Sequence, residues 1–193
     1  MGHKHHGKSS ASFLNADEIL LELNLEGNEN FLDAGCGDGF VSLKAIEKYL
    51  PEGTVYAVDI FDESIKQLDD YKQKNNIENL INIEADLTKG IPIDDGMIDV
   101  LFMLNVFHGF TSENRDDVIN ELIRLTKDDG KIAIMDFKPF DMQVGPPTEI
   151  RISPSELEDI FKGYNLKKVY LNEEIGAEFS EGKSHYLMIF KKE

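Results

Sequence analysis

The chain has 193 residues, of which 41% are apolar, and its 37 acidic and 20 basic side chains give a formal net charge of −17. This length suits one domain with a sizeable core, and no apolar run is long enough to span a membrane. Nucleic-acid binding needs Lys and Arg to neutralise phosphates, so the acidic balance argues against a nucleic-acid partner. The single cysteine, Cys36, excludes an internal disulfide and, with no segment typical of a secretion signal, leads us to expect a cytoplasmic protein.

The first residues mix lysines, glycines and serines with three histidines, His3, His5 and His6. Short His-rich tracts can bind metal, but a terminus without a packing pattern is more often disordered. We therefore expect residues 1–14 to form a flexible arm without a functional metal site, followed by a single domain over residues 15–193. Residues 16–25 have helical spacing, and Asn15 is the expected cap of that helix.

Residues 31–40 read FLDAGCGDGF, the end of an apolar strand followed by glycines at every second position and then by a helical pattern over residues 41–50. Glycines allow a ligand to lie against the backbone at a helix N-terminus, which suits NAD, FAD or S-adenosylmethionine. Asp33 and Asp38 would repel a pyrophosphate but suit a sulfonium and an ammonium, and Asp33 can accept from the ammonium. The third glycine is Gly39, whereas the dinucleotide pattern requires a glycine one position later.

Asp59 ends the apolar run 54–60, 20 residues after Gly39, where one carboxylate can hold both ribose hydroxyls of an adenosine. Together the acid, the alternating glycines and Asp59 resemble the cofactor motifs of class I S-adenosylmethionine-dependent methyltransferases. The resemblance implies S-adenosylmethionine as cofactor, S-adenosylhomocysteine as product, and an N-terminal segment that closes the pocket. It also implies a set of cofactor-binding residues in these two stretches: Asp33, Ala34, Gly35, Cys36, Gly37, Asp59 and Ile60.

A polar-faced helix over residues 62–76 and a strand over residues 80–85 follow, and Asp86 comes directly after the strand. In the resembling family an acid at this strand tip accepts from the adenine amino group, and the next residue, here Leu87, offers its backbone amide to the ring. From the residues alone, Asp86 is equally a turn former.

Residues 97–104 form a continuous apolar run, as expected of a strand buried on both faces of a parallel sheet. Ligands lie outside the carboxyl ends of such strands, so Asn105 and His108 should line the site of methyl transfer. His108 is the candidate general base, because an ordinary histidine titrates close to neutral pH. The alternative is that His108 packs or contacts cofactor without titrating. Asn105 is a candidate for a catalytic role and for a contact with cofactor or backbone.

Residues 112–126 have helical spacing with Ser112 as expected cap and Glu121 facing outward, residues 128–130 suggest a turn, and residues 131–137 a fifth strand. The alternation of strands and helices over residues 31–137 predicts an α/β doubly wound sheet. The family implies a Rossmann-like sheet of seven strands with helices on both faces. In it, the last strand runs antiparallel between the fifth and sixth, here residues 185–190 and 166–171.

The long stretch 138–152 contains three prolines and leads through Arg151 into a helix over residues 154–163 capped by Ser153. Arg151 is a candidate contact for an anionic substrate, and an ion pair within the protein is the alternative. With this loop and its NVFH segment, the chain resembles small prokaryotic UbiE-like methyltransferases over nearly all its length.

We therefore expect S-adenosylmethionine-dependent methyl transfer to a small-molecule acceptor by in-line displacement, with no metal. Two alternatives stay open: a non-catalytic module that binds S-adenosylmethionine or S-adenosylhomocysteine, and a nucleotide-dependent oxidoreductase. Arsenic methyltransferases of the family use several cysteines, and this chain has one. The sequence leaves the oligomeric state open, a homodimer included.

Overall fold

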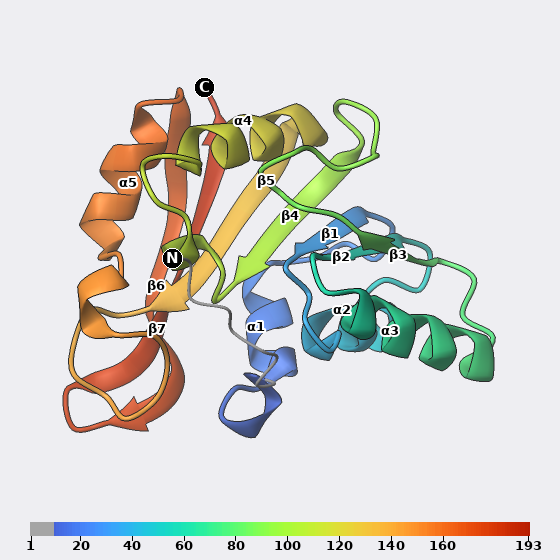
Figure 1. Cartoon of the computed structure of the whole chain (residues 1–193), viewed down its shortest axis with the longest axis horizontal. Helices are drawn as coiled ribbons and strands as arrows, with labels where there is room; N and C mark the ends of the chain where they lie inside the picture. Colours follow the sequence, from blue (N-terminus) through green and yellow to red (C-terminus); the bar gives the residue numbers. More distant parts are fainter. Residues whose placement is uncertain (1–9) are drawn as a thin grey trace.

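The computed structural model describes residues 10–193, which are built around one seven-stranded sheet (Figure 1). The strands, in chain order, are β1 (Asn30–Ala34), β2 (Thr54–Asp59), β3 (Leu80–Glu84), β4 (Ile98–Leu104), β5 (Thr126–Phe137), β6 (Leu166–Phe179) and β7 (Gly182–Lys192). Across the sheet the order is β3-β2-β1-β4-β5-β7-β6, with β1 to β5 parallel and β7 antiparallel to both neighbours. This confirms the predicted doubly wound, Rossmann-like sheet and the place of its last strand.

Helices cover both faces of the sheet (Figure 1). One face carries α1 (Ala16–Glu22), α2 (Phe40–Lys44), the π-helical turn η2 (Ala45–Tyr49) and α3 (Asp62–Asn75), and the other carries α4 (Arg115–Leu125) and α5 (Pro154–Lys162). Three short 3-10 segments lie in the connections: η1 (Ser10–Ser12), η3 (Phe107–Gly109) and η4 (Thr148–Ile150). No helix among residues 10–193 is long and apolar enough to cross a bilayer.

The strands bury apolar side chains on both faces because successive residues of a strand point to opposite sides. In β1, for example, Phe31 packs in the cluster under α1, α2 and α3, while the next residue, Leu32, packs in the cluster under α4 and α5. The same alternation holds in β4, where Leu101 and Phe102 are both fully buried in opposite clusters. The continuous apolar runs of the sequence are thus explained by a sheet with two covered faces.

The fourth helix differs from the expectation at its start and on one face. It begins at Arg115 after Asn114, so Ser112 is not its cap. Glu121, expected to face outward, is only 8% exposed. Its carboxylate accepts from the backbone amide of Ile91 at 2.6 Å and from the Arg124 guanidinium at 2.7 and 2.8 Å, which gives the buried charge two kinds of donor.

The expected turn at residues 128–130 lies inside β5. The pairing of β4 with β5 passes from Ile98 opposite Thr126 to Val100 opposite Lys131, so the intervening residues form a bulge in an otherwise continuous strand. The last two strands are longer than their apolar patterns, and they form one hairpin whose turn falls between Phe179 and Gly182.

Candidate functional site

The glycine loop joins β1 to α2 at the carboxyl edge of the sheet. The backbone amides of Gly35 and Cys36 both donate to the carbonyl of Val58 in β2, at 2.8 and 2.9 Å, which anchors the loop. A Cβ at Gly35 would lie 2.5 Å from Cγ2 of Val106, so this glycine permits close packing against the segment after β4. A Cβ at Gly37, in contrast, would meet nothing within 4 Å. The open face of the loop at Gly37 is where a ligand can approach the main chain.

We expect Gly37→Ala and Gly39→Ala to fail in different ways. Both residues have left-handed backbone angles, φ +54° and +78°, so alanine costs about 1–2 kcal/mol at either position. At Gly39 the new methyl would also collide with the buried side chain of Leu68, adding about 1–3 kcal/mol of overpacking. Thermal unfolding should show the larger loss of stability for Gly39→Ala. Calorimetric titration with S-adenosylhomocysteine should show that Gly37→Ala loses more affinity than its smaller loss of stability explains. Equal losses of stability would contradict this assignment.

Asp59, at the end of β2, is held in place by the glycine loop. Its carboxylate accepts from the amide of Gly37 at 2.7 Å and from the amide of Phe61 at 3.0 Å, and the residue is 8% exposed. The next residue, Ile60, is 56% exposed although it is apolar. A fixed carboxylate beside an exposed apolar side chain suits an adenosine, which presents hydroxyls and a flat ring a short distance apart. The residues here therefore fit the predicted cofactor.

Asp33 lies beneath the loop rather than on its surface. It is 2% exposed, and its carboxyl accepts from the hydroxyl of Ser42 in α2 at 2.6 Å. Burial raises the pKa of Asp33 to about 7, and the Ser42 hydrogen bond offsets only part of that effect. A cationic ligand nearby would favour the ionised form, which is compatible with the predicted role toward an ammonium. Asp38 is exposed and accepts from the amide of Phe40 at the start of α2.

Asp86 forms the turn that the residues alone allow. One carboxylate oxygen accepts from the amide and the hydroxyl of Thr88, at 2.9 and 2.7 Å, and the other lies 3.0 Å from the Lys89 ammonium. The hydrogen bond from Thr88 is the main reason that the pKa of Asp86 is lowered. Leu87 is 7% exposed and packs in the core, so only its backbone can serve a ligand. Contact of this turn with adenine stays a prediction.

Ala34 and Cys36 flank Gly35 and are both buried. Burial raises the pKa of the Cys36 thiol well above its ordinary value, and the neighbouring carboxyl of Asp33 adds to the effect. The thiol is therefore neutral and unreactive at neutral pH. Neither side chain is therefore exposed to a ligand.

Asn105 follows β4 in a left-handed conformation, φ +58°, and its amide donates to the carbonyl of Met135 in β5. Its side chain links two distant parts of the chain. The side-chain oxygen accepts from Nε2 of His185 in β7 at 3.0 Å, and the side-chain nitrogen donates to Ser10 Oγ at 3.4 Å. Asn105 thus fastens the start of the described chain to the carboxyl edge of the sheet.

His185 was absent from the predicted site. Its ring lies 4.2 Å from that of Phe137, centre to centre, and 6.0 Å from that of Phe13, and its Nδ1 accepts from Ser184 Oγ at 2.6 Å. Burial lowers the pKa of His185 to about 4, so the ring is neutral at pH 7. The side chain therefore has a fixed tautomer and serves as a rigid support for Asn105.

Residues 10–14, assigned to a flexible arm from the sequence, pack against this aromatic group. Phe13 lies 6.1 Å from Phe137, and Leu14 is 8% exposed within the core cluster under α1. The packed segment contacts residues at the tips of β4, β5 and β7. Closure of the cofactor pocket by N-terminal residues, which the family resemblance implies, stays a prediction. His3, His5 and His6 lie outside the described residues.

His108 and Asp136 form a buried pair at the tips of β4 and β5. Nδ1 of His108 donates to Oδ1 of Asp136 at 2.8 Å, and the backbone amide of His108 donates to Oδ2 at 3.1 Å. The amide of Phe137 also donates to Asp136, at 2.8 Å. A carboxylate on Nδ1 selects the tautomer whose lone pair is on Nε2, as a general base requires. Asp136 was missed in the sequence, where it is the one polar side chain in the apolar run IAIMDF.

Arg151 is buried and directs its guanidinium into the loop that precedes it. It donates to the carbonyls of Phe140 at 2.6 Å, Val144 at 3.0 Å and Pro146 at 2.7 and 2.9 Å, with a longer bond to Lys138. Among the described residues it forms no ion pair. Arg151 therefore shapes residues 138–147, and its contact with an anionic substrate stays a prediction.

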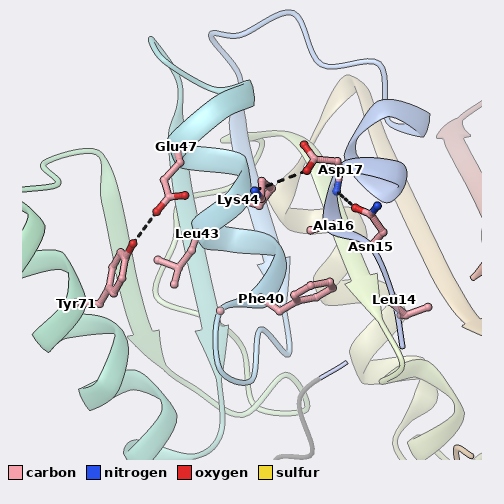
Figure 2. Close-up of a pocket in the computed structure, with 10 residues that line it drawn as sticks. Leu14, Asn15, Ala16, Asp17, Phe40, Leu43, Lys44, Glu47 and Tyr71 are labelled. Carbon is pink, nitrogen blue, oxygen red and sulfur yellow. Dashed lines mark hydrogen bonds and ion pairs between the residues drawn. The ribbon is translucent and has the colours of Figure 1, made fainter. Parts of the chain in front are cut away.

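A cavity of about 530 Å³ lies between α1, α2 and α3, next to Gly39 at the end of the glycine loop (Figure 2). Its polar groups are paired with one another: Tyr71 donates to Glu47 at 2.6 Å, and the Lys44 ammonium lies 3.7 Å from the carboxylate of Asp17. We assign no ligand to this cavity, because its charges stabilise the packing of the three helices.

A seven-stranded sheet with this order, a glycine loop after β1 and an acid at the tip of β2 define a class I, S-adenosylmethionine-dependent methyltransferase. Residues 25–191 match the family model described as "Methyltransferase domain", and the chain belongs to that family. It is similar to the "SAM dependent methyltransferase" of Aquifex aeolicus, with a TM-score of 0.81, 24% identity, and 95% of this chain and 92% of the other covered.

Two curated relatives are considerably longer than this chain. The arsenite methyltransferase of Halobacterium salinarum is 26% identical over 136 residues, covering 70% of this chain and 33% of that protein. The demethylmenaquinone methyltransferase of Lactobacillus johnsonii is 26% identical over 123 residues, covering 62% of this chain and 48% of that protein. The chain thus spans between a third and a half of the curated relatives it matches.

Proposed function

We propose that the protein transfers a methyl group from S-adenosylmethionine to a small-molecule acceptor. The observation that carries this proposal is the short segment from Asn105 to His108. Val106 packs against Gly35 of the glycine loop, and two residues later His108 is oriented by Asp136. One segment thus contains both a residue that packs against the glycine loop and the proposed proton acceptor.

The residues around the loop would each serve a different part of the cofactor. Asp59 would hold the ribose hydroxyls, Ile60 would cover the ring, and the turn at Asp86 and Leu87 would meet the adenine edge. Ionised Asp33 would balance the ammonium, and the open face of the loop at Gly37 would let the ligand lie against the main chain. When bound, S-adenosylmethionine supplies a methyl group on a positively charged sulfur, and the electrons of the broken carbon–sulfur bond stay with the sulfur of S-adenosylhomocysteine.

The protein's own contribution is then to exclude water, to align the acceptor and to remove its proton. Residues 10–14, held by Asn105, would cover the site, and His108 would take the proton at Nε2. An arsenite acceptor, as in the name of the Halobacterium relative, has little support here. Arsenic prefers thiolates, and the one thiol, Cys36, is buried with a raised pKa.

Calorimetric titration with S-adenosylmethionine and S-adenosylhomocysteine tests the cofactor. We expect micromolar binding by the unaltered protein, and a loss of about 100-fold in Asp59→Ala, because hydrogen bonds from two hydroxyls to a charged acceptor disappear. Asp70→Asn, an exposed acid on α3, is the charge-matched control and should bind normally. If the unaltered protein bound neither ligand, the proposal would fail.

A non-catalytic binding module remains the second candidate, since the glycine loop by itself requires only binding. Mass spectrometry after incubation with S-adenosylmethionine and a panel of phenols, quinols, amines and thiols separates the two. A methylated product supports the enzyme, whereas cofactor binding without any product supports the module. Titration with NADH tests the oxidoreductase alternative in the same samples.

A further inference from the structure

A groove of about 540 Å³ opens beside His108, between η3, η4 and α5. Its apolar lining comes from four side chains that are half-buried or buried: Phe110, Ile150, Ile152 and Ile160. His108 is the lining residue that belongs to the pair with Asp136. The groove therefore offers an apolar bed with the proposed general base in its lining.

The charges that line this groove differ in how they are held. Glu149 and Asp159 are exposed and form no ion pair among residues 10–193, while Glu156 accepts from Ser153 in the cap of α5. The two arginines are less exposed, since Arg151 is buried and Arg115 is half-buried. Arg151 serves main-chain carbonyls, and Arg115 donates to the carbonyl of Phe110 at 2.8 Å and lies over the ring of Phe107.

The exposed charged side chains of the groove are thus carboxylates above an apolar floor. Such a site complements a molecule with an apolar body and a positive charge. A neutral ligand with the same apolar part would leave the carboxylates without a partner. An anionic ligand would be repelled by them.

We propose that this groove binds the methyl acceptor, and that the acceptor is an amine carried on an apolar body; the inference rests on the methyl transfer proposed above. An amine is protonated at neutral pH and cannot accept a methyl group until one N–H bond breaks. The electron pair of that bond stays on nitrogen, and the proton passes to Nε2 of His108. Asp136 on the opposite ring nitrogen stabilises the imidazolium that results.

Three probes that share one apolar body test the proposal: 2-phenylethylamine, 2-phenylethanol and 3-phenylpropionate. Each is titrated into the full-length protein saturated with S-adenosylhomocysteine, so that no turnover occurs. We expect the amine to bind at least about 10-fold more tightly than the alcohol, and the carboxylate to bind most weakly. Asp159→Asn combined with Glu149→Gln should weaken the amine about 10-fold and leave the alcohol unchanged.

Glu173→Gln, which removes an exposed charge on β6, is the matched control and should leave all three affinities unchanged. Equal affinity for amine and alcohol would overturn the proposal, and so would tighter binding of the carboxylate, which would point to Arg115 instead. Saturation with S-adenosylhomocysteine is measured first on each variant. A protein that binds S-adenosylhomocysteine but does not favour the amine refutes the acceptor class alone, whereas absence of S-adenosylhomocysteine binding refutes the proposed function.

Discussion

Asp33→Asn should make the protein more stable above pH 7 and weaken its binding of S-adenosylmethionine. Burial raises the pKa of the Asp33 carboxyl from 3.8 to about 7, so the folded protein at pH 8 contains an ionised group that it solvates poorly. A shift of this size corresponds to at most about 4 kcal/mol. Asparagine removes the charge, and its carbonyl oxygen can still accept from the Ser42 hydroxyl. In the unaltered protein this hydroxyl donates to Asp33 at 2.6 Å.

The pH dependence follows from the sign of the shift. The folded state binds the Asp33 proton more tightly than the unfolded state, so this group does not destabilise the protein below about pH 4. The penalty grows as the pH rises to about 7 and is constant above it. Thermal unfolding of Asp33→Asn should therefore show a gain that is largest at pH 8 and disappears toward pH 4.

Asp38→Asn is the matched control, because it removes a carboxylate from the same loop at an exposed position. It should change stability little at any pH. S-adenosylmethionine affinity of the unaltered protein should fall below pH 7 as Asp33 takes up its proton, and Asp33→Asn should bind weakly without that dependence. A stability gain that is equal at pH 4 and pH 8 would show that burial of the charge is not its cause.

The helices and strands and their order along the chain were predictable, because they depend on local sequence signals. Continuous apolar runs fixed the buried strands, and the glycine spacing at residues 35–39 fixed the turn into α2. Asp59 was found because its position relative to the glycines is a matter of counting residues. The structure places it against the amide of Gly37, a contact between two strand ends that neighbour each other in the sheet.

The partners of the site residues were not predictable in this way, since they depend on the register between strands far apart in the sequence. Met135 pairs with Leu104, which brings Asp136 beside the segment that contains His108. Phe137 pairs with His185 across β5 and β7, and this places a histidine from the end of the chain next to Asn105. A shift of one residue in either pairing would turn these side chains to the other face of the sheet.

Arg151 and Glu121 show a second limit of prediction from the sequence. Both are charged residues that a sequence pattern assigns to the surface or to a ligand, yet both are buried. Arg151 donates to backbone carbonyls, and Glu121 accepts from the backbone amide of Ile91 and from Arg124. A loop with three prolines leaves many carbonyls without partners of its own, and one arginine can satisfy several of them. This use of a charge depends on the path of the loop, which the sequence does not specify.

His108→Ala and Asp136→Asn should lower the rate of methyl transfer by about 10²- to 10⁴-fold, the range typical of a lost general base. Asparagine at position 136 removes the carboxylate charge that would stabilise the imidazolium formed when His108 takes up the proton. S-adenosylhomocysteine affinity should stay within about twofold, because the proposed cofactor contacts at Asp59 and the glycine loop are left in place. Rates are measured with any acceptor that the panel identifies, alongside calorimetry and thermal unfolding.

Added imidazole distinguishes a catalytic role of His108 from a structural one. It should restore part of the activity of His108→Ala, because a free base can occupy the space left by the ring, and should leave Asp136→Asn unchanged, since there the ring is still present. Asp141→Asn, an exposed acid in the loop after β5, controls for loss of charge near the site and should keep full activity. If His108→Ala retained its rate with a folded chain and normal cofactor affinity, the acceptor would have to arrive already deprotonated. His108 would then serve only to pack the tip of β4 against Asp136.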